Sequence, residues 1–319
     1  MINYLLYYQL RKEESNTPSF MEGRLVIDEA GHEIYYKLYG SGPETLVCLH
    51  GGPGADHRYL VRMGELSGEV LKVLLYDQLG SGQSDRPDDD SLWTVPRFVG
   101  ELETIRSEMN LGRVHLYGQS WGGMLALQYA LDHPEGVKSL ILSNTAASMP
   151  EWAKVMAKLK MQLPTEIFTT IMEFEATQQY EHPDMIEAMW EFYARYVRRS
   201  FPFEPARSLK ECKEILAFLG ELGPAYTKMW GPFEFLPIGT LLHWDVTDRL
   251  GEIKVPTLIV CGLYDEAAPE LHRAMADRVP NNEFVIFGNS SHLIILEKEA
   301  DAYLGLIKNF IDRVISSSG

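Results

Sequence analysis

Short apolar runs alternate with segments of helical periodicity in the first part of the chain. Two strands around a turn at Glu29–Gly31 are expected within residues 24–39. Apolar runs bounded by glycine, proline or polar turn residues are typical of strands that are buried on both faces. These runs occupy residues 45–49, 71–77, 113–117 and 137–142, and helical spacing covers residues 94–110 and 122–131. The pattern predicts a mostly parallel central sheet with flanking helices.

The alternation is interrupted between about residues 146 and 245. This stretch is rich in Met, Phe, Tyr and Trp at helical spacing, and no strand pattern is visible in it. The strand pattern resumes at residues 256–262 and 283–287, and a final helix is expected over 298–315. We therefore predict an α/β core made of residues 1–145 and 246–319, with a helical cap at 146–245 inserted into it.

Composition and charge exclude several classes of function. The chain has 319 residues, of which 45% are hydrophobic, and this is enough to bury a large core. A net charge of −16 without a Lys/Arg run argues against nucleic-acid binding. No membrane-spanning stretch or signal peptide is evident. Cys48, Cys212 and Cys261 are too widely spaced for a disulfide or metal framework, so we expect a cytoplasmic protein.

The segment Gly118–Gly122 matches the pattern G-x-S-x-G and lies between a predicted strand and a predicted helix. In that context the glycines permit a sharp turn that lifts a serine hydroxyl above the sheet. The helix start behind the serine favours negative charge. We therefore predict that Ser120 is a catalytic nucleophile; the alternative is a glycine-rich turn that only connects the two elements.

A serine hydroxyl needs a base, and the base needs an orienting acid. His292 follows the predicted strand 283–287, and Asp265 follows the strand 256–262. Both would lie at the carboxyl ends of strands, on the same edge of the sheet as Ser120. Asp245 and Asp248 are rival acids, but they precede their strand and would lie at its opposite end.

The segment His50–Gly54 has the sequence His-Gly-Gly-Pro-Gly and follows another predicted strand. Glycines in this place let backbone N–H groups approach a developing oxyanion. We assign the two oxyanion donors to the backbone N–H groups of Gly52 and Trp121. The alternative is a tight turn without a catalytic role.

Three motifs together resemble the proline iminopeptidase family of the α/β-hydrolase superfamily. They are His50–Gly54, Tyr76–Asp85 and Gly118–Gly123. The resemblance implies an α/β-hydrolase fold with a helical cap. It also implies removal of one N-terminal residue, often proline, from short peptides or amino-acid amides. No metal or organic cofactor is expected.

Two further segments, Gly231–Phe235 and Tyr264–Glu266, resemble the tricorn-interacting aminopeptidases. That resemblance implies that Glu234 and Glu266 hold the free amino group of the substrate. A carboxylate pair is suited to an ammonium group, and it would be left unpaired by an N-blocked peptide. Phe233 stands where the relatives are expected to have Asn, which leaves the pocket shape open.

Other interpretations of the cap stay open from the sequence. Glu234 could be a solvated residue and Glu266 a charge at a helix start, and Glu191 is a rival anchor in an aromatic helix. The large aromatic residues of the cap are expected to form mainly its own core rather than a substrate cage. They are Trp190, Phe192, Tyr193 and Trp230.

Two other functions compete with an aminopeptidase or amidase. An esterase or lactonase acting on neutral substrates would need the same three catalytic residues without the two glutamates. A ligand-binding protein without catalysis is also known for folds of this kind in general. The motifs do not separate peptides from amino-acid amides as substrates, and they do not indicate an oligomeric state.

Overall fold

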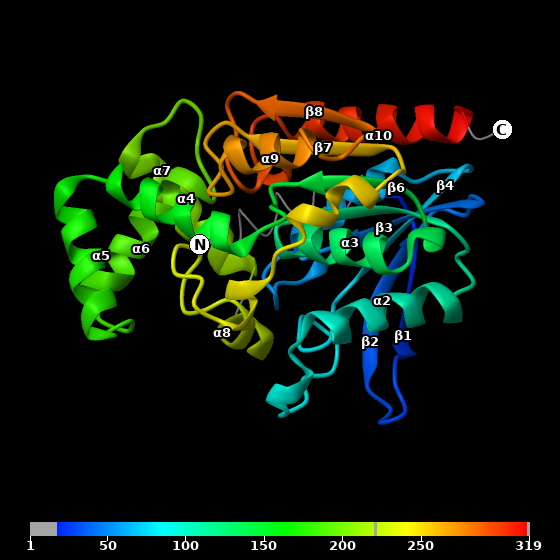
Figure 1. Ribbon diagram of the computed structural model, residues 1–319, viewed down its shortest axis with the longest axis horizontal. Coiled ribbons are helices and arrows are strands. Elements are labelled where there is room, and N and C mark those ends of the chain that lie inside the picture. The colour runs from blue at the N-terminus through cyan, green and yellow to red at the C-terminus, as the bar shows by residue number, and fades with distance from the viewer. Residues whose placement is uncertain (1–17, 220–221, 318–319) are drawn as a thin grey trace.

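The computed structural model describes residues 18–219 and 222–317 of the chain. Its centre is an eight-stranded sheet with the order β1-β2-β4-β3-β5-β6-β7-β8 (Figure 1). β2 is antiparallel to both β1 and β4, and the remaining neighbours are parallel. The strands are β1 (Phe20–Val26), β2 (Glu33–Tyr39), β3 (Glu44–Leu49), β4 (Leu71–Tyr76), β5 (Val114–Gln119), β6 (Val137–Ser143), β7 (Thr257–Gly262) and β8 (Asn282–Phe287).

Helices cover both faces of the sheet because its inner strands are apolar on both sides. Leu102, Leu125 and Met275, which lie on three helices of one face, belong to one core cluster. Leu60 and Ile307 belong to a second cluster on the other face. The first face carries α2 (Val95–Glu108), α3 (Trp121–Asp132) and α9 (Pro269–Ala276), and the second carries the 3₁₀ helix η1 (His57–Leu66) and α10 (Ala300–Ser317).

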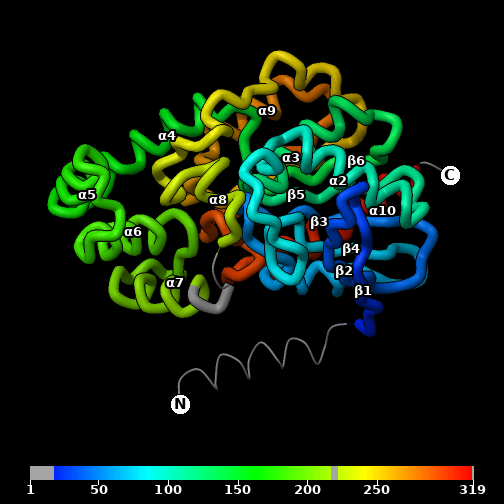
Figure 2. The backbone as a smooth tube through the Cα atoms, turned by 90° about the horizontal axis from the view of Figure 1, so that it is seen from below, coloured from blue at the N-terminus to red at the C-terminus, as the bar shows by residue number. Residues whose placement is uncertain are grey.

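In the described part of the chain five α-helices are inserted between β6 and β7, and they project beyond one end of the sheet (Figures 1 and 2). They begin at Met149, shortly after β6 ends at Ser143, so they lie at the carboxyl end of that strand. Trp152 and Trp230 are fully buried in the same core cluster as α3, which joins these helices to the core. The helices are α4 (Met149–Met161), α5 (Thr165–Thr177), α6 (Pro183–Tyr196), α7 (Pro205–Leu219) and α8 (Pro224–Met229).

The predicted mostly parallel sheet with flanking helices is confirmed. The structure differs in having two helices that the sequence did not predict, η1 and α9, and in its beginning, where β1 starts at Phe20 rather than near residue 24. β1 is an edge strand whose first three residues are exposed, so no buried alternation marks its start. We propose residues 146–245 as the cap, since α4 to α8 all lie inside those bounds. In the described part of the chain no helix has the length and hydropathy to cross a membrane.

Candidate active site

Ser120 lies in a sharp turn between β5 and α3. Its backbone has φ 57° and ψ −125°, a conformation that costs a non-glycine residue about 1–3 kcal/mol. The flanking positions have room only for glycine, because a Cβ atom there would clash with neighbouring backbone atoms. A Cβ on Gly118 would lie 2.2 Å from the Gly122 carbonyl oxygen, and a Cβ on Gly122 would lie 2.1 Å from the Leu49 carbonyl oxygen. The motif therefore specifies this strained turn through close backbone packing.

His292 and Asp265 are brought together by the loops that follow β8 and β7. Nδ1 of His292 lies 2.7 Å from Oδ1 of Asp265, and both side chains are buried. Because an ionised carboxylate can only accept hydrogen bonds, we assign the proton of the ring to Nδ1. Nε2 then has a free lone pair that faces the site. Oδ1 of Asp265 also accepts the Ala267 N–H at 2.9 Å, which fixes the carboxylate against its own loop.

Asn144 supports the acid from the end of β6, and the sequence interpretation missed it. Its Nδ2 donates to Oδ2 of Asp265 at 2.7 Å and to the Ser291 carbonyl at 3.1 Å. The residue is buried and has φ 52°, which asparagine tolerates better than most residues. Its Oδ1 accepts from the Ser143 hydroxyl at 2.6 Å. An asparagine directly after a strand is the signal that could have identified it.

A chain of hydrogen bonds connects the loop at His50–Gly54 with the turn at Ser120 and with His292. The Gly51 N–H donates to the Tyr59 hydroxyl at 2.6 Å, and this hydroxyl donates to Oε1 of Gln119 at 2.7 Å. Nε2 of Gln119 then donates to the His292 carbonyl at 3.1 Å. The residue preceding Ser120 therefore contacts both neighbouring loops of the site.

Gln78 joins the same loop to the start of α3. Its Oε1 accepts from Nε1 of Trp121 at 2.8 Å, and its backbone N–H donates to Nε2 of His50 at 3.0 Å. Nδ1 of His50 donates to the Gly51 carbonyl at 2.9 Å. Burial lowers the pKa of His50, which agrees with a neutral ring carrying its proton on Nδ1. Both carriers of the predicted oxyanion donors, Gly52 and Trp121, are next to this network.

Gly52 has φ 111°, a backbone conformation that favours glycine. Trp121 is the first residue of α3, where N–H groups have no acceptor within the helix. The cap also reaches this loop, because the Gly223 N–H donates to the Gly54 carbonyl at 2.8 Å. The arrangement therefore suits an oxyanion site that is closed from above by the cap.

Glu266 is fully buried beside the histidine. Its Oε1 lies 3.5 Å from Nε2 of His292, yet neither carboxylate oxygen has a hydrogen-bond partner among the described residues. Burial, together with the nearby carboxylates of Glu234 and Asp265, raises the pKa of Glu266 well above its usual range. A buried carboxylate without donors is costly, and a cation placed there would remove that cost.

Glu234 approaches Glu266 from the cap. Its backbone N–H donates to the Tyr193 hydroxyl at 3.1 Å, which anchors it to α6. Burial raises the pKa of Glu234, while the nearby His292 lowers it in part. The structure therefore brings together the two glutamates that the sequence predicted as anchors, although one comes from the cap and the other from the core.

The rival residues lie elsewhere. Glu191 forms an ion pair with Arg195 one turn further along α6. Asp245 accepts from the Ser148 hydroxyl at 2.7 Å and from the Thr247 N–H at 2.8 Å, and Asp248 is exposed. Since Asp265 already pairs with the imidazole, Asp245 and Asp248 are not needed as its acid.

The cap aromatics form a continuous core above the site. Trp230 and Phe192 are fully buried, as expected for cap core. Phe233 stacks on Phe235, with ring centroids 5.3 Å apart. The sequence interpretation did not single out Trp152, whose ring lies edge-on to His292 at 6.1 Å between centroids. This indole gives the histidine an apolar wall.

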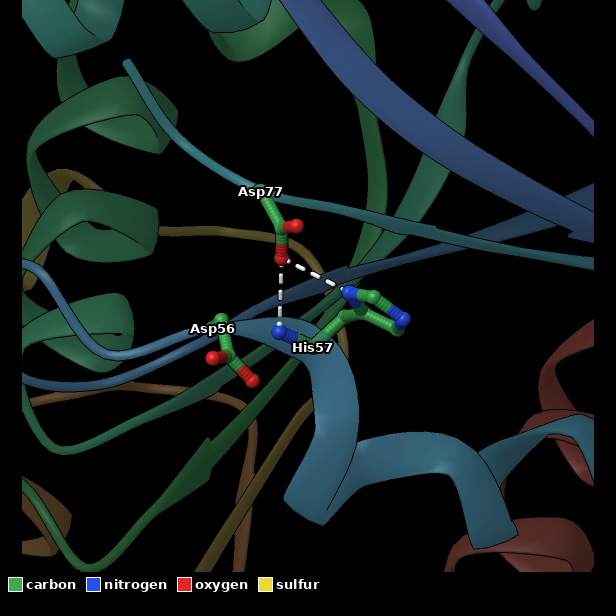
Figure 3. A group of neighbouring side chains, drawn as sticks. All are labelled: Asp56, His57 and Asp77. Atoms are coloured by element: carbon green, nitrogen blue, oxygen red, sulfur yellow. Dashed lines mark hydrogen bonds and ion pairs between the residues drawn. The ribbon is translucent and has the colours of Figure 1, made fainter. Parts of the chain in front are cut away.

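One group of metal-ligand types occurs in the described part of the chain, formed by Asp56, His57 and Asp77 (Figure 3). Asp56 is paired with the Arg58 guanidinium. Asp77 accepts from the His57 backbone and from its Nδ1, each at 2.8 Å, and from the Gln83 N–H at 2.8 Å. Although burial opposes it, the His57 hydrogen bond lowers the pKa of Asp77. With these oxygens satisfied, the group does not fit a metal ion.

Comparisons with known proteins agree with this geometry. The alpha/beta hydrolase fold family matches residues 44–299. A proline iminopeptidase of Saccharolobus solfataricus is 39% identical over 90% of this chain and 91% of its own length. The crystal structure of a proline iminopeptidase from Mycobacterium smegmatis superposes with a TM-score of 0.79 at 30% identity, covering 93% of this chain and all of that one. The crystal structure of VinJ gives a TM-score of 0.80 at 34% identity, covering 94% of this chain and 99% of that one.

Proposed function

The chain belongs to the proline iminopeptidase family of α/β hydrolases, and from this premise we propose that it releases N-terminal proline from short peptides through an acyl-enzyme on Ser120. The observation that carries the proposal is the buried, unpartnered carboxylate of Glu266 beside His292. A hydrolase that accepted only neutral acyl groups would have no use for a buried acidic group without donors at this place.

The proposed chemistry takes place on the core side of the site, which we define as Ser120, His292 and Asp265. His292 removes the Ser120 proton through Nε2, and Ser120 attacks the carbonyl carbon of the N-terminal residue. Asp265 holds Nδ1–H and stabilises the imidazolium. The backbone N–H groups of Gly52 and Trp121 stabilise the oxyanion. His292 then protonates the leaving amine, and water hydrolyses the acyl-enzyme without a metal or cofactor.

Recognition is assigned to the cap side of the site, which we define as Glu234 of the cap together with Glu266, the core residue that it approaches. We place the substrate ammonium between Glu234 and Glu266, where charge-assisted hydrogen bonds replace the missing donors. Because Glu266 lies within 3.5 Å of Nε2 of His292, an amine held there belongs to the residue whose carbonyl is attacked. This geometry favours removal of one residue at a time, from peptides and amino-acid amides alike.

The proposed function also bears on the cellular compartment of the protein and on the molecules that it binds. We place the enzyme in the cytoplasm, where its three free, buried cysteines remain reduced. Its partners are small substrates with a free N-terminus rather than nucleic acid or membrane, in line with the net charge of −16.

The test compares L-proline p-nitroanilide with its N-acetylated twin, measuring kcat/KM for each. Acetylation removes the positive charge while the scissile bond is retained. We expect a loss of at least about a hundredfold, because charge-assisted contacts to the carboxylates of Glu234 and Glu266 are removed. Equal values for the two anilides would contradict the proposal and leave a hydrolase of neutral acyl groups.

A further inference from the structure

The nitrogen that has to act as the base already faces an acidic group. Nδ1 of His292 is committed to Asp265, so only Nε2 can accept the Ser120 proton. In the structure Nε2 lies 3.5 Å from Oε1 of Glu266. A neutral imidazole nitrogen and a carboxylate oxygen are both acceptors, and they repel each other unless a proton lies between them.

Among the residues that the structure describes, the charged groups with the largest effect on the pKa of Glu266 are acidic. Glu234 and Asp265 are the carboxylates that act on it, and the Tyr193 and Tyr226 phenols face the same group from α6 and α8. Within the described ranges no hydrogen bond of good geometry reaches either oxygen of Glu266, and the Glu234 side chain interacts with it most closely from the cap. Burial and the two carboxylates raise its pKa, so a proton is retained there more strongly than at an ordinary glutamate.

We propose that the free enzyme holds one proton between Glu266 and Nε2 of His292, and that the substrate ammonium displaces it. The inference rests on the proposed amine site. The charge balances, because the ammonium enters as one proton leaves to solvent. Whichever of the two atoms carries the proton, it occupies the lone pair of Nε2. The base is therefore free to accept from Ser120 only after an amine is bound.

Glu266 thus determines specificity at the chemical step as well as in binding. A substrate without the amine can bind, but it does not displace the proton from the lone pair of Nε2 of His292, so the base cannot accept the Ser120 proton. Replacing Glu266 with an uncharged residue removes the competing partner of Nε2. The variant is then expected to lose activity on amino-acid substrates and to gain activity on neutral esters.

The first experiment measures protons released on binding. The Ser120→Ala variant, which cannot turn over, is titrated calorimetrically with L-prolinamide in buffers of different ionisation enthalpy. At about pH 6.5 an α-amine is still mostly protonated. We expect roughly half to one proton released per ligand bound. Binding without proton release overturns this inference alone, whereas the absence of binding contradicts the proposed function and the inference together.

The second experiment uses Glu266→Met, which has neither charge nor a hydrogen-bond donor. We expect kcat/KM for p-nitrophenyl acetate to rise about threefold or more while that for L-proline p-nitroanilide falls. Glu270→Gln is the matched control, because Glu270 is more than half exposed and pairs with Lys158, so both rates should stay unchanged. If Glu266→Met lowers both rates equally, Glu266 only supports the site structurally and the inference is wrong.

Discussion

The core side and the cap side of the site differ in how their buried carboxylates are satisfied. Asp265 and Glu266 are neighbours in the chain, and both are buried. Asp265 is held by Asn144, the Ala267 N–H and His292. Glu266 has no donor among the described residues. A carboxylate with fixed donors is a permanent part of the machinery, whereas one without donors marks the place where a cation from outside can bind.

The Asp56, His57 and Asp77 group extends the same comparison. Both of its carboxylates are hydrogen-bonded within the protein, so it supports the structure next to the loop at His50–Gly54. Two acidic side chains and a histidine packed close together do not by themselves make a binding site. The unsatisfied group beside His292 differs because its missing partner has the chemistry of an ammonium group.

The largest expected effect comes from the core side. Asp265→Asn keeps the shape of the side chain but no longer stabilises Nδ1–H of His292. We expect kcat for proline anilide to fall about ten-thousandfold, because the imidazole then takes the wrong tautomer. Steady-state kinetics with purified variant would measure this. A loss of less than tenfold would show that Asp265 is not the orienting acid.

The cap side should behave differently. Glu234→Gln and Glu266→Gln should each lower kcat/KM for proline anilide by about ten- to a hundredfold, the value of a charged hydrogen bond. Labelling of Ser120 by a fluorophosphonate, which has no amine, should be retained in both variants. If labelling is lost together with peptidase activity, these glutamates are needed for catalysis itself and not only for recognition of the amine.

Asn144→Gly tests how much the hydrogen bond to Asp265 contributes to the core side of the site. Glycine accepts the φ of 52° without strain, so the change removes the amide donor to Asp265 and retains the backbone. We expect kcat to fall about tenfold with KM nearly unchanged. A change in KM alone would instead place Asn144 in substrate binding.

The smallest effect concerns stability. The raised pKa of Glu266 means that the folded protein binds its proton more tightly than the unfolded chain. The stabilisation is therefore complete below the unfolded pKa and is lost as pH rises through the folded value. Glu266→Gln should melt a few degrees above wild type at about pH 8, with the gap closing towards pH 5. A difference in melting temperature that is independent of pH would contradict a raised pKa for Glu266 in the folded protein.

The sequence predicted the sheet well, and it indicated that Ser120, Asp265 and His292 follow strands, because these features depend on local patterns. Strands of apolar residues, and polar residues at their carboxyl ends, are visible in the order of the chain. Asn144 was missed because its role depends on a contact with Asp265, which lies 121 residues further along the chain. The two residues meet because they follow the neighbouring strands β6 and β7. Gln119 was visible as the variable position of a motif, but its contacts to Tyr59 and His292 were not.

The cap was harder to interpret from its sequence. Glu191 and Glu234 both lie in aromatic segments, and only the fold shows that Glu191 pairs with Arg195 while Glu234 approaches Glu266. Without the resemblance to relatives, the chain order alone would not have distinguished them. Helical periodicity identifies which residues are buried, but not which buried charge lacks a partner.

The most direct measurement compares L-proline p-nitroanilide with the anilide of cyclopentanecarboxylic acid, which has the same ring shape and no nitrogen. The ratio of their kcat/KM values isolates the amine. We predict a ratio of at least about a hundred in the wild-type protein, and a ratio near one when Glu234 and Glu266 are both changed to Gln. A ratio that is unchanged in the double variant would contradict recognition by these two carboxylates.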